Sequence, residues 1–199
     1  MMYAVRMASI ALATILAAAT ATRAQDAYNI TGGKIDIVCS LTVGGSFDAR
    51  TKRLSGELSV APSAGHAVAI QGTLQVDFQT LETGIGLRDR HMLKNYLEVD
   101  RGQDFSTATF NDLRVDKLEG KTRFTGILTL HGTDKAVSGT ADLQQKDGSI
   151  RVQARFPLRL SEFQIPSPTY LGVGVRDEIQ VNVMLTAVPV TSTASHSSR

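Results

Sequence analysis

Alternation of apolar and polar residues runs through most of this 199-residue chain and constrains its fold more than any other feature. It is clearest in residues 150–160, where isoleucine, valine, alanine, phenylalanine and leucine share one phase, and arginine and glutamine fill most of the other. Strands with a single apolar face are typical of antiparallel sheets, which must hide that face. The sequence therefore predicts an all-β domain, either a sandwich or an up-and-down barrel. Of the two we favour an eight-stranded antiparallel barrel.

The expected strands are joined mostly by short turns that contain glycine, asparagine, aspartate or proline. They cover residues 35–42, 47–60, 67–80, 106–115, 118–130, 136–143, 150–160 and 175–188. Residues 100–104 are expected to form a polar loop.

The segment 83–97 is the one place where the period-two pattern stops. Gly84 and Gly86 interrupt the preceding strand, and the apolar residues that follow are spaced three and four apart, as on one side of a helix. A helix this short is not stable alone. We therefore expect it to cap one open end of the barrel, with Leu93 and Tyr96 packed against that end.

Charged residues crowd the first turn of this helix. Arg88, Asp89 and His91 can either anchor the helix through bonds to strand ends or contact a ligand directly. We prefer the anchoring role. Asp89 and His91 are two residues apart and point to different sides of a helix, which argues against an acid–base pair.

The N-terminal residues have the organisation of a secretory signal peptide. Arg6 precedes an alanine-rich apolar run, and small residues follow at the expected cleavage region. We expect residues 1–24 to be removed on export to the periplasm, residues 25–189 to form the domain, and the Ser/Thr-rich residues 190–199 to be disordered.

Charge and cysteine content exclude several classes of protein. The 21 basic and 19 acidic side chains are too balanced to favour nucleic acid. The apolar run near the N-terminus is too short to span a bilayer comfortably, so no stable membrane insertion is expected. Cys39 is the only cysteine, which rules out an intramolecular disulfide, and we interpret it as a buried apolar residue.

Small residues occur in the apolar phase of several strands and suggest internal room. Gly72 lies between Ile70 and Leu74, and Gly126 also has large neighbours two positions away. Inward glycines either leave space for one slender ligand or let strands bend at barrel corners, and both readings stay open. The expected lining of an apolar tunnel is Ile70, Gly72, Leu74, Phe78, Phe124, Gly126, Leu128, Leu130 and Phe156.

Catalytic and metal-binding patterns are sparse. No histidine pair has zinc-ligand spacing, and the sequence contains no nucleophile elbow or phosphate-binding glycine loop, so neither a metal site nor a catalytic residue is expected. The remaining enzymatic alternative is acid–base chemistry on a bound lipid or quinone through His91 or Tyr170.

The segment TGIGLRDRHMLKNYLEV at 83–99 resembles the YceI-like family of bacterial secreted lipid-binding proteins. ATF at 108–110, FTGILTLHGTDKAV at 124–137, RLSEFQI at 159–165 and VRDEIQVNVMLTA at 175–187 extend the resemblance in the same order. It implies a lipocalin-like barrel that holds a long isoprenoid chain, such as a polyprenyl or quinone tail, and it implies no catalytic residues.

The expected function is therefore a periplasmic carrier or scavenger of an isoprenoid-type lipid, with no cofactor beyond that ligand. Whether the chain forms a homodimer is left open. An eight-stranded outer-membrane barrel is disfavoured because the aromatic girdles of such barrels are missing.

Overall fold

The structure is a computed structural model, and it describes residues 26–61, 68–170 and 172–190. The expected signal peptide and all but the first residue of the expected tail lie outside these ranges. The strands are β1 Asp26–Ser40, β2 Ser46–Thr51, β3 Leu54–Ala61, β4 Val68–Asp77, β5 Thr107–Val115, β6 Gly120–Leu130, β7 Thr133–Lys146, β8 Ser149–Arg159, β9 Thr169–Tyr170, β10 Val173–Gly174 and β11 Glu178–Pro189.

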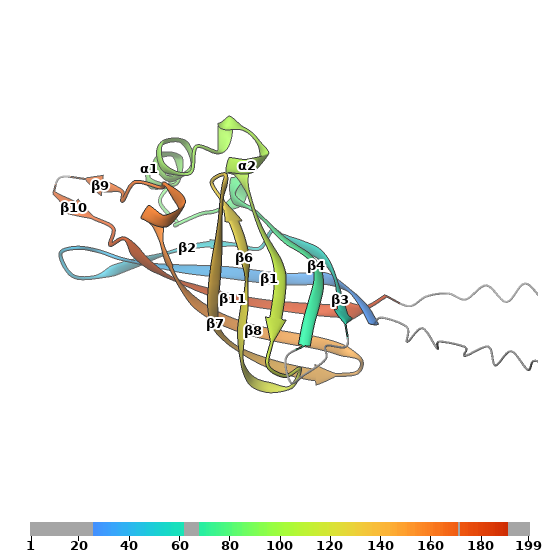
Figure 1. Cartoon of the computed structure of the whole chain (residues 1–199). Helices are drawn as coiled ribbons and strands as arrows, with labels where there is room; N and C mark the ends of the chain where they lie inside the picture. The colour runs from blue at the N-terminus through green and yellow to red at the C-terminus, as the bar shows by residue number, and fades with distance from the viewer. Residues whose placement is uncertain (1–25, 62–67, 171, 191–199) are drawn as a thin grey trace, which may run out of the picture.

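The strands form a closed antiparallel barrel, as the sequence predicts (Figure 1). Neighbours along the chain pair in turn from β3 to β8, β11 follows β8, and β11 pairs with β1 to close the wall. This last pairing runs from Tyr28 opposite Pro189 to Val38 opposite Gln180. It joins the two ends of the described chain.

One expected strand, 47–60, is two strands in the structure. β2 pairs with residues 35–40 of β1, and β3 pairs with residues 26–29 of the same edge. The two therefore share one position in an eight-stranded wall. The break follows Thr51, whose side chain is buried and lies 2.7 Å from the Thr80 hydroxyl.

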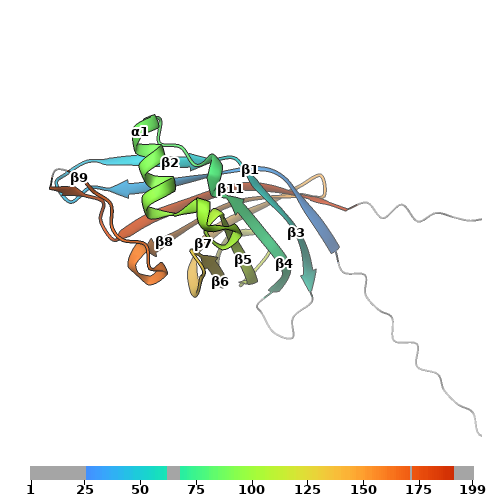
Figure 2. The same cartoon turned by 90° about the horizontal axis from the view of Figure 1, so that it is seen from above.

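The helical segments gather between β4 and β5 on one end of the barrel (Figures 1 and 2). They are the 3-10 helix η1 Phe78–Thr80, the α-helix α1 Gly86–His91, the π-helix η2 Met92–Tyr96, the 3-10 helix η3 Val99–Arg101 and the short α-helix α2 Gln103–Ser106. The expected helix over 87–97 is therefore α1 continued by η2. The expected polar loop at 100–104 lies mostly within η3 and α2.

The same end carries two further additions. The 3-10 helix η4, Leu160–Phe163, follows β8, and the β9–β10 hairpin comes next. We call this end the mouth. The opposite end is built from tight turns such as Asp147–Gly148, where both residues have a positive φ, as a two-residue hairpin with a type I′ turn requires.

The inner face of the wall forms one apolar core. At its centre, the rings of Phe110, Phe124 and Phe156 lie with centroids 5.8–6.3 Å apart. Most are edge-to-face contacts, an arrangement that aromatic rings favour. Within the described part of the chain, no helix has the length and apolar content needed to cross a membrane.

Candidate ligand-binding cavity

Two apolar cavities occupy the inside of the barrel. The deep cavity has a volume of about 190 Å³ and is lined by residues from every position of the wall. The mouth cavity has a volume of about 530 Å³ and lies between α1–η2, the β1–β2 hairpin and the segment 165–179. Six residues border both cavities, so the two lie next to each other, and we call these six residues the neck. The neck residues are Ile37, Leu81, Leu97, Leu160, Ile165 and Ile179.

The deep cavity collects most of the side chains that the sequence predicts as tunnel lining. They come from β4, η1, β6 and β8, whose inward positions meet in the closed barrel. The predicted residues that border it are Ile70, Leu74, Phe78, Phe124, Leu128, Leu130 and Phe156. Thr109 is the one polar residue in this lining, so the deep cavity offers a ligand almost nothing but apolar contact.

Gly126 and Gly72 are the two predicted lining residues that the structure does not place on a cavity. At Gly126 a Cβ atom would lie 2.5 Å from Cε1 of Phe110, so the room expected beside this glycine is occupied by that ring. Gly72 has a φ of +111°, and a Cβ there would collide with the backbone of Glu57. Gly72 lies where the register of β4 against β5 shifts. A glycine at such a point lets the strand bend.

The helix over the mouth is tied down through Thr83. The Asp89 carboxylate accepts hydrogen bonds from the Thr83 backbone N–H, at 2.7 Å, and from the Thr83 hydroxyl. Arg88 donates to the Thr83 hydroxyl at 2.9 Å and to its carbonyl oxygen at 3.3 Å. The guanidinium carbon of Arg88 also lies 4.1 Å from the centroid of the Phe47 ring on β2, a cation–π contact. These bonds anchor α1 to the segment before it and to β2.

The other predicted helix residues take different positions. Leu93 and Tyr96 are half-buried and pack against the core, and of these only Tyr96 borders the mouth cavity. His91 borders the mouth cavity and is exposed, and within the described part of the chain its side chain makes no hydrogen bond. Tyr170 lies in β9, but its side chain is outside the described residues.

The mouth cavity also has lining that the sequence did not predict. Cys39 of β1 is buried there beside Ala49 of β2. Burial, reinforced by the Asp48 carboxylate, raises the pKa of the Cys39 thiol to about 11, although Arg88 opposes the shift. At neutral pH Cys39 therefore stays a protonated, weakly polar part of the wall, which agrees with its expected apolar role.

A cluster around His131 fixes the mouth on its other side. The His131 side chain is 7% exposed, with Nδ1 3.2 Å from the Phe163 carbonyl oxygen and Nε2 3.3 Å from Glu98 Oε2. The Nε2 contact has the distance of an ion pair but not the alignment of a hydrogen bond. The Glu98 carboxylate also accepts a 2.6 Å hydrogen bond from Arg101, which is the main reason that its pKa is lowered. The cluster joins η3, the β6–β7 turn and η4.

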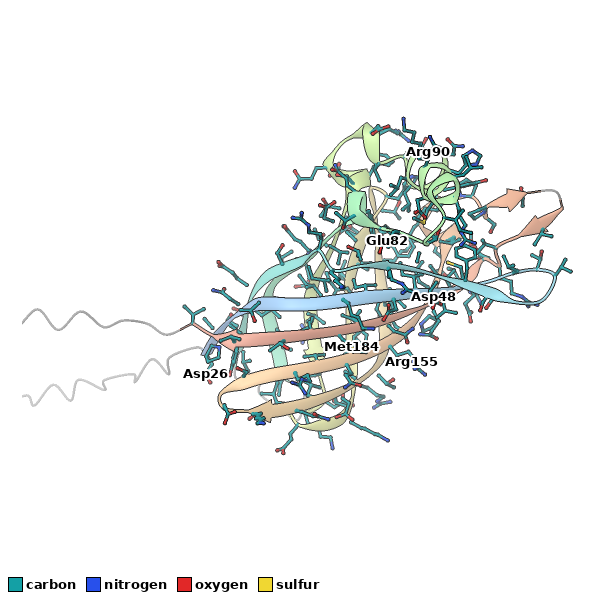
Figure 3. All side chains as sticks on the ribbon, turned by 180° about the vertical axis from the view of Figure 1, so that it is seen from behind. Asp26, Asp48, Glu82, Arg90, Arg155 and Met184 are labelled. Atoms are coloured by element: carbon teal, nitrogen blue, oxygen red, sulfur yellow. The ribbon has the colours of Figure 1, made fainter. Side chains whose placement is uncertain are left out.

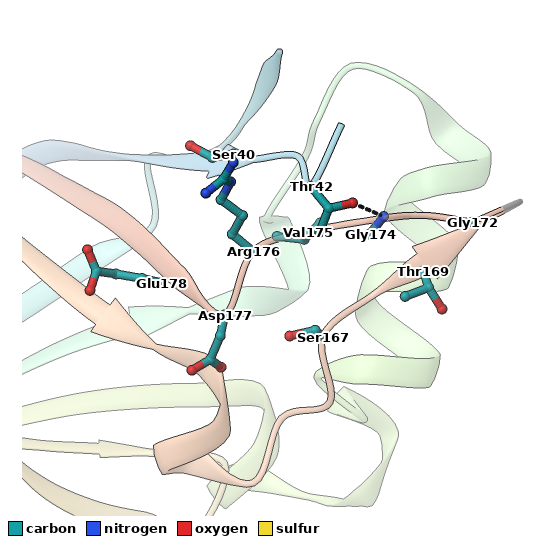
Figure 4. Close-up of a pocket in the computed structure, with 10 residues that line it drawn as sticks. All are labelled: Ser40, Thr42, Ser167, Thr169, Gly172, Gly174, Val175, Arg176, Asp177 and Glu178. Carbon is teal, nitrogen blue, oxygen red and sulfur yellow. Dashed lines mark hydrogen bonds between the residues drawn. The ribbon is translucent and has the colours of Figure 1, made fainter. Parts of the chain in front are cut away.

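A polar groove of about 800 Å³ lies beside the mouth, along β9, β10 and the start of β11 (Figure 4). Its polar groups are largely used in holding the structure together. Gly174 N–H donates to the Thr42 hydroxyl at 3.0 Å, Arg176 donates to the Leu41 carbonyl oxygen, and Asp177 accepts two hydrogen bonds from Ser161. These bonds hold β10 against the end of β1, and they hold the segment before β11 against η4.

Comparison with known proteins shows where this fold occurs. Residues 22–187 match the model of the YceI-like domain. Among curated proteins, no sequence matches the chain.

Solved structures with the same fold share little sequence with this chain. BcnA from Burkholderia cenocepacia is 18% identical, with a TM-score of 0.62 over 78% of this chain and 96% of that one. A polyisoprenoid binding domain from Saccharophagus degradans, implicated in plant cell wall breakdown, is 16% identical, with a TM-score of 0.60 over 82% and 98% of the two chains. The YceI protein of Campylobacter jejuni is 19% identical, with a TM-score of 0.55 over 75% and 88%.

Proposed function

Because this chain belongs to the family of YceI-like domains, we propose that it is a binding protein that holds an isoprenoid-type lipid, such as a polyprenyl or quinone tail, inside its barrel. The observation that carries the proposal is the pair of adjacent apolar cavities inside the barrel, which in this proposal act together as one ligand tunnel. The domain from Saccharophagus degradans is a polyisoprenoid binding domain, which supports the same class of ligand.

The chemistry of the tunnel fits a long hydrocarbon chain. Each methylene group moved from water into the apolar interior gains roughly 0.8 kcal/mol, so several isoprene units bind without strong polar contacts. The mouth cavity has a volume within the usual range of small-molecule sites, about 300–1,000 Å³. The bound chain therefore runs from the mouth through the neck into the deep cavity.

A ligand head group would stay at the mouth. His91, Tyr96 and Thr169 border that cavity and carry polar groups that could hydrogen-bond a head group. Arg88 also borders it but is engaged with Thr83 and Phe47. In this proposal His91 orients the ligand and carries out no covalent chemistry. Residues 1–24 would direct the protein to the periplasm, where it transports, stores or scavenges the lipid.

The first test is mass spectrometry of organic extracts from protein purified without detergent. We expect an isoprenoid lipid in the extract, and the lipid-free protein should take up an isoprenoid quinone added from solution. A protein that neither retains nor takes up an isoprenoid would overturn the proposal.

A substitution in the mouth cavity locates the site. Ala49 is 2% exposed and borders the mouth cavity, so Ala49→Phe should fill part of the ligand's space. Filling a real cavity costs little stability, whereas overpacking a full core costs about 1–3 kcal/mol. We expect a folded variant with strongly reduced quinone uptake. Ala136→Phe adds the same ring at an exposed position of β7 and should bind like the wild type. Equal uptake by both variants would place the ligand elsewhere.

A further inference from the structure

Exposed apolar side chains gather around the mouth instead of being scattered over the barrel. Within the described part of the chain, six large hydrophobic residues are exposed, and four of them lie on elements of the mouth. We call these four the mouth rim; they are Val43 at 70% exposure, Ile85 at 54%, Leu87 at 60% and Val173 at 37%. Isolated surface hydrophobics need no explanation, but a cluster of them indicates a surface that meets an apolar partner.

The mouth rim is continuous with the inside of the barrel. Ile85, Leu87 and Val173 border the mouth cavity as well as solvent. Val43 lies at the tip of the β1–β2 hairpin, which is bound to β10 through the Thr42 N–H and the Gly174 carbonyl oxygen at 2.8 Å. Figures 1 and 2 show α1, β9 and the tip of this hairpin at the same end of the molecule. An apolar path therefore leads from the outer surface into the tunnel.

Positive charge accompanies this apolar rim. Leu87, Arg90 and Lys94 are three and four residues apart, so they share one side of the α1–η2 segment, and all three are exposed. Figure 3 shows Arg90 on the outer side of the helical cap. Asp89 is the one acidic residue among residues 86–96, and its carboxylate is bound to Thr83. An apolar rim flanked by lysine and arginine is the composition of surfaces that lie at a membrane interface.

We propose that the mouth docks on the surface of a bilayer that contains anionic phospholipids, so that an isoprenoid chain passes directly between the bilayer and the tunnel. This inference rests on the proposed function and adds the place where the ligand is exchanged. The rim side chains enter the boundary between head groups and acyl chains, and Arg90 and Lys94 contact the anionic head groups. The hydrocarbon then enters the barrel without crossing water.

Co-sedimentation with lipid vesicles tests the apolar part of the docking surface. Vesicles of phosphatidylethanolamine and phosphatidylglycerol are the probe, and Ile85→Ser with Leu87→Ser is the variant. Both side chains are more than half exposed, so the fold should tolerate the change. We expect vesicle binding to fall by about tenfold or more. The control is Met184→Ser, because Met184 is 41% exposed on the outer face of β11 away from the mouth (Figure 3). Its vesicle binding should equal that of the wild type.

The charged part of the docking surface is tested with a second variant and its matched control. Replacing Arg90 and Lys94 by glutamine should weaken binding to the anionic vesicles by about fivefold for each charge, and the difference should disappear on vesicles of phosphatidylcholine alone. Replacing Lys146 and Arg151 by glutamine removes the same charge at the opposite end of the barrel and should change nothing. Equal losses in the two variants would mean that only net charge matters, and would overturn the docking surface.

Quinone uptake separates this inference from the proposed function. Arg90 and Lys94 border neither cavity, so the variant with glutamine at both positions should take up dispersed quinone like the wild type and extract it from anionic vesicles more slowly. If the wild type binds quinone but this variant matches it in vesicle binding and extraction, docking fails and the proposed function stands. If the wild type takes up no quinone from either source, the proposed function fails. If the rim substitutions instead convert a dimer to a monomer, the surface is an interface between two copies and docking is overturned.

Discussion

The deep half of the barrel and its mouth are both apolar, yet they are filled in different ways. In the deep half, the Phe110 ring occupies the space beside Gly126. A Cβ at Gly139 would lie 2.9 Å from Cε1 of the Phe124 ring and closer still to Phe156 Cβ and the Arg155 carbonyl oxygen. At the mouth, a cavity more than twice as large remains between the wall strands β1 and β2, the α1–η2 helix and the segment 165–179. Small residues inside a barrel therefore need not create room, because a ring from the neighbouring strand can take it.

The deep half and the mouth are also stabilised by different interactions. The deep half is held by side-chain packing, whereas the mouth is held by hydrogen bonds such as those of Asp89 to Thr83 and Asp177 to Ser161. A close-packed core loses stability when a side chain changes its volume, whereas a hydrogen-bonded cap can keep its position around a cavity.

Truncating the aromatic layer should produce the largest effect. Phe156→Ala removes a ring that is 7% exposed and in contact with two others, so we expect the free energy of unfolding to fall by about 3–5 kcal/mol. Phe47→Ala at the half-buried mouth should cost much less. Urea denaturation of both variants measures the difference. Equal losses would mean that the two halves are packed alike.

Filling the space beside Gly126 should have an intermediate effect. Gly126→Leu must displace the Phe110 ring, and overpacking of this kind costs about 1–3 kcal/mol. Gly32→Leu is the control, because a Cβ at Gly32 meets no atom within 4 Å. Thermal denaturation compares the two. A Gly126→Leu variant as stable as the wild type would show that the deep half has more room than its packing indicates.

Acid should weaken the mouth, with the smallest of the three effects. Hydrogen bonds from the hydroxyl and then the backbone N–H of Ser161 lower the pKa of Asp177 below its usual range. A carboxyl whose pKa is lowered by folding stabilises the protein above its unfolded-state pKa, about 4, and this contribution is lost as the pH falls. The stability difference between wild type and Asp177→Asn should therefore shrink below about pH 4.

Ser161→Ala supplies the check on this assignment. If Ser161 is the partner that lowers the pKa of Asp177, the double variant Ser161→Ala with Asp177→Asn should lose no less stability in acid than Asp177→Asn alone. If the difference in stability between the wild type and Asp177→Asn were constant across the pH range, the role of Asp177 would be contradicted.

The sequence predicts the wall of this barrel well and the mouth poorly. Alternation reports which face of a strand meets water, so the strand at 150–160 and most of the deep lining could be recognised locally. The break between β2 and β3 has only a weak local signal, a change of apolar phase from the odd positions of β2 to the even positions of β3. At the break, Thr51 contacts Thr80 of η1, which is 29 residues away along the chain. Local pattern carries no information about such a partner.

The same limit applies to single residues of the candidate site. Gly126 was predicted to leave space, but the ring that fills it comes from β5, whose register against β6 shifts between Asn111 and Arg114. His131 and Glu98 meet only because η3 folds back over the β6–β7 turn. The short-range pairing of Asp89 and Arg88 with Thr83, in contrast, stays within six residues and follows the anchoring role that the sequence suggests.

The pairing of β1 with β11 has a consequence for how the chain reaches its native state. It brings residues near the start of the domain beside residues near its end, such as Ile35 opposite Val183, and the pairing of β11 with this edge of β1 closes the wall. Closing so long a loop costs chain entropy before any contact repays it, which makes barrels of this kind slow to fold. The nascent chain must therefore remain open, with its apolar inner face unprotected, until its last strand has been synthesised.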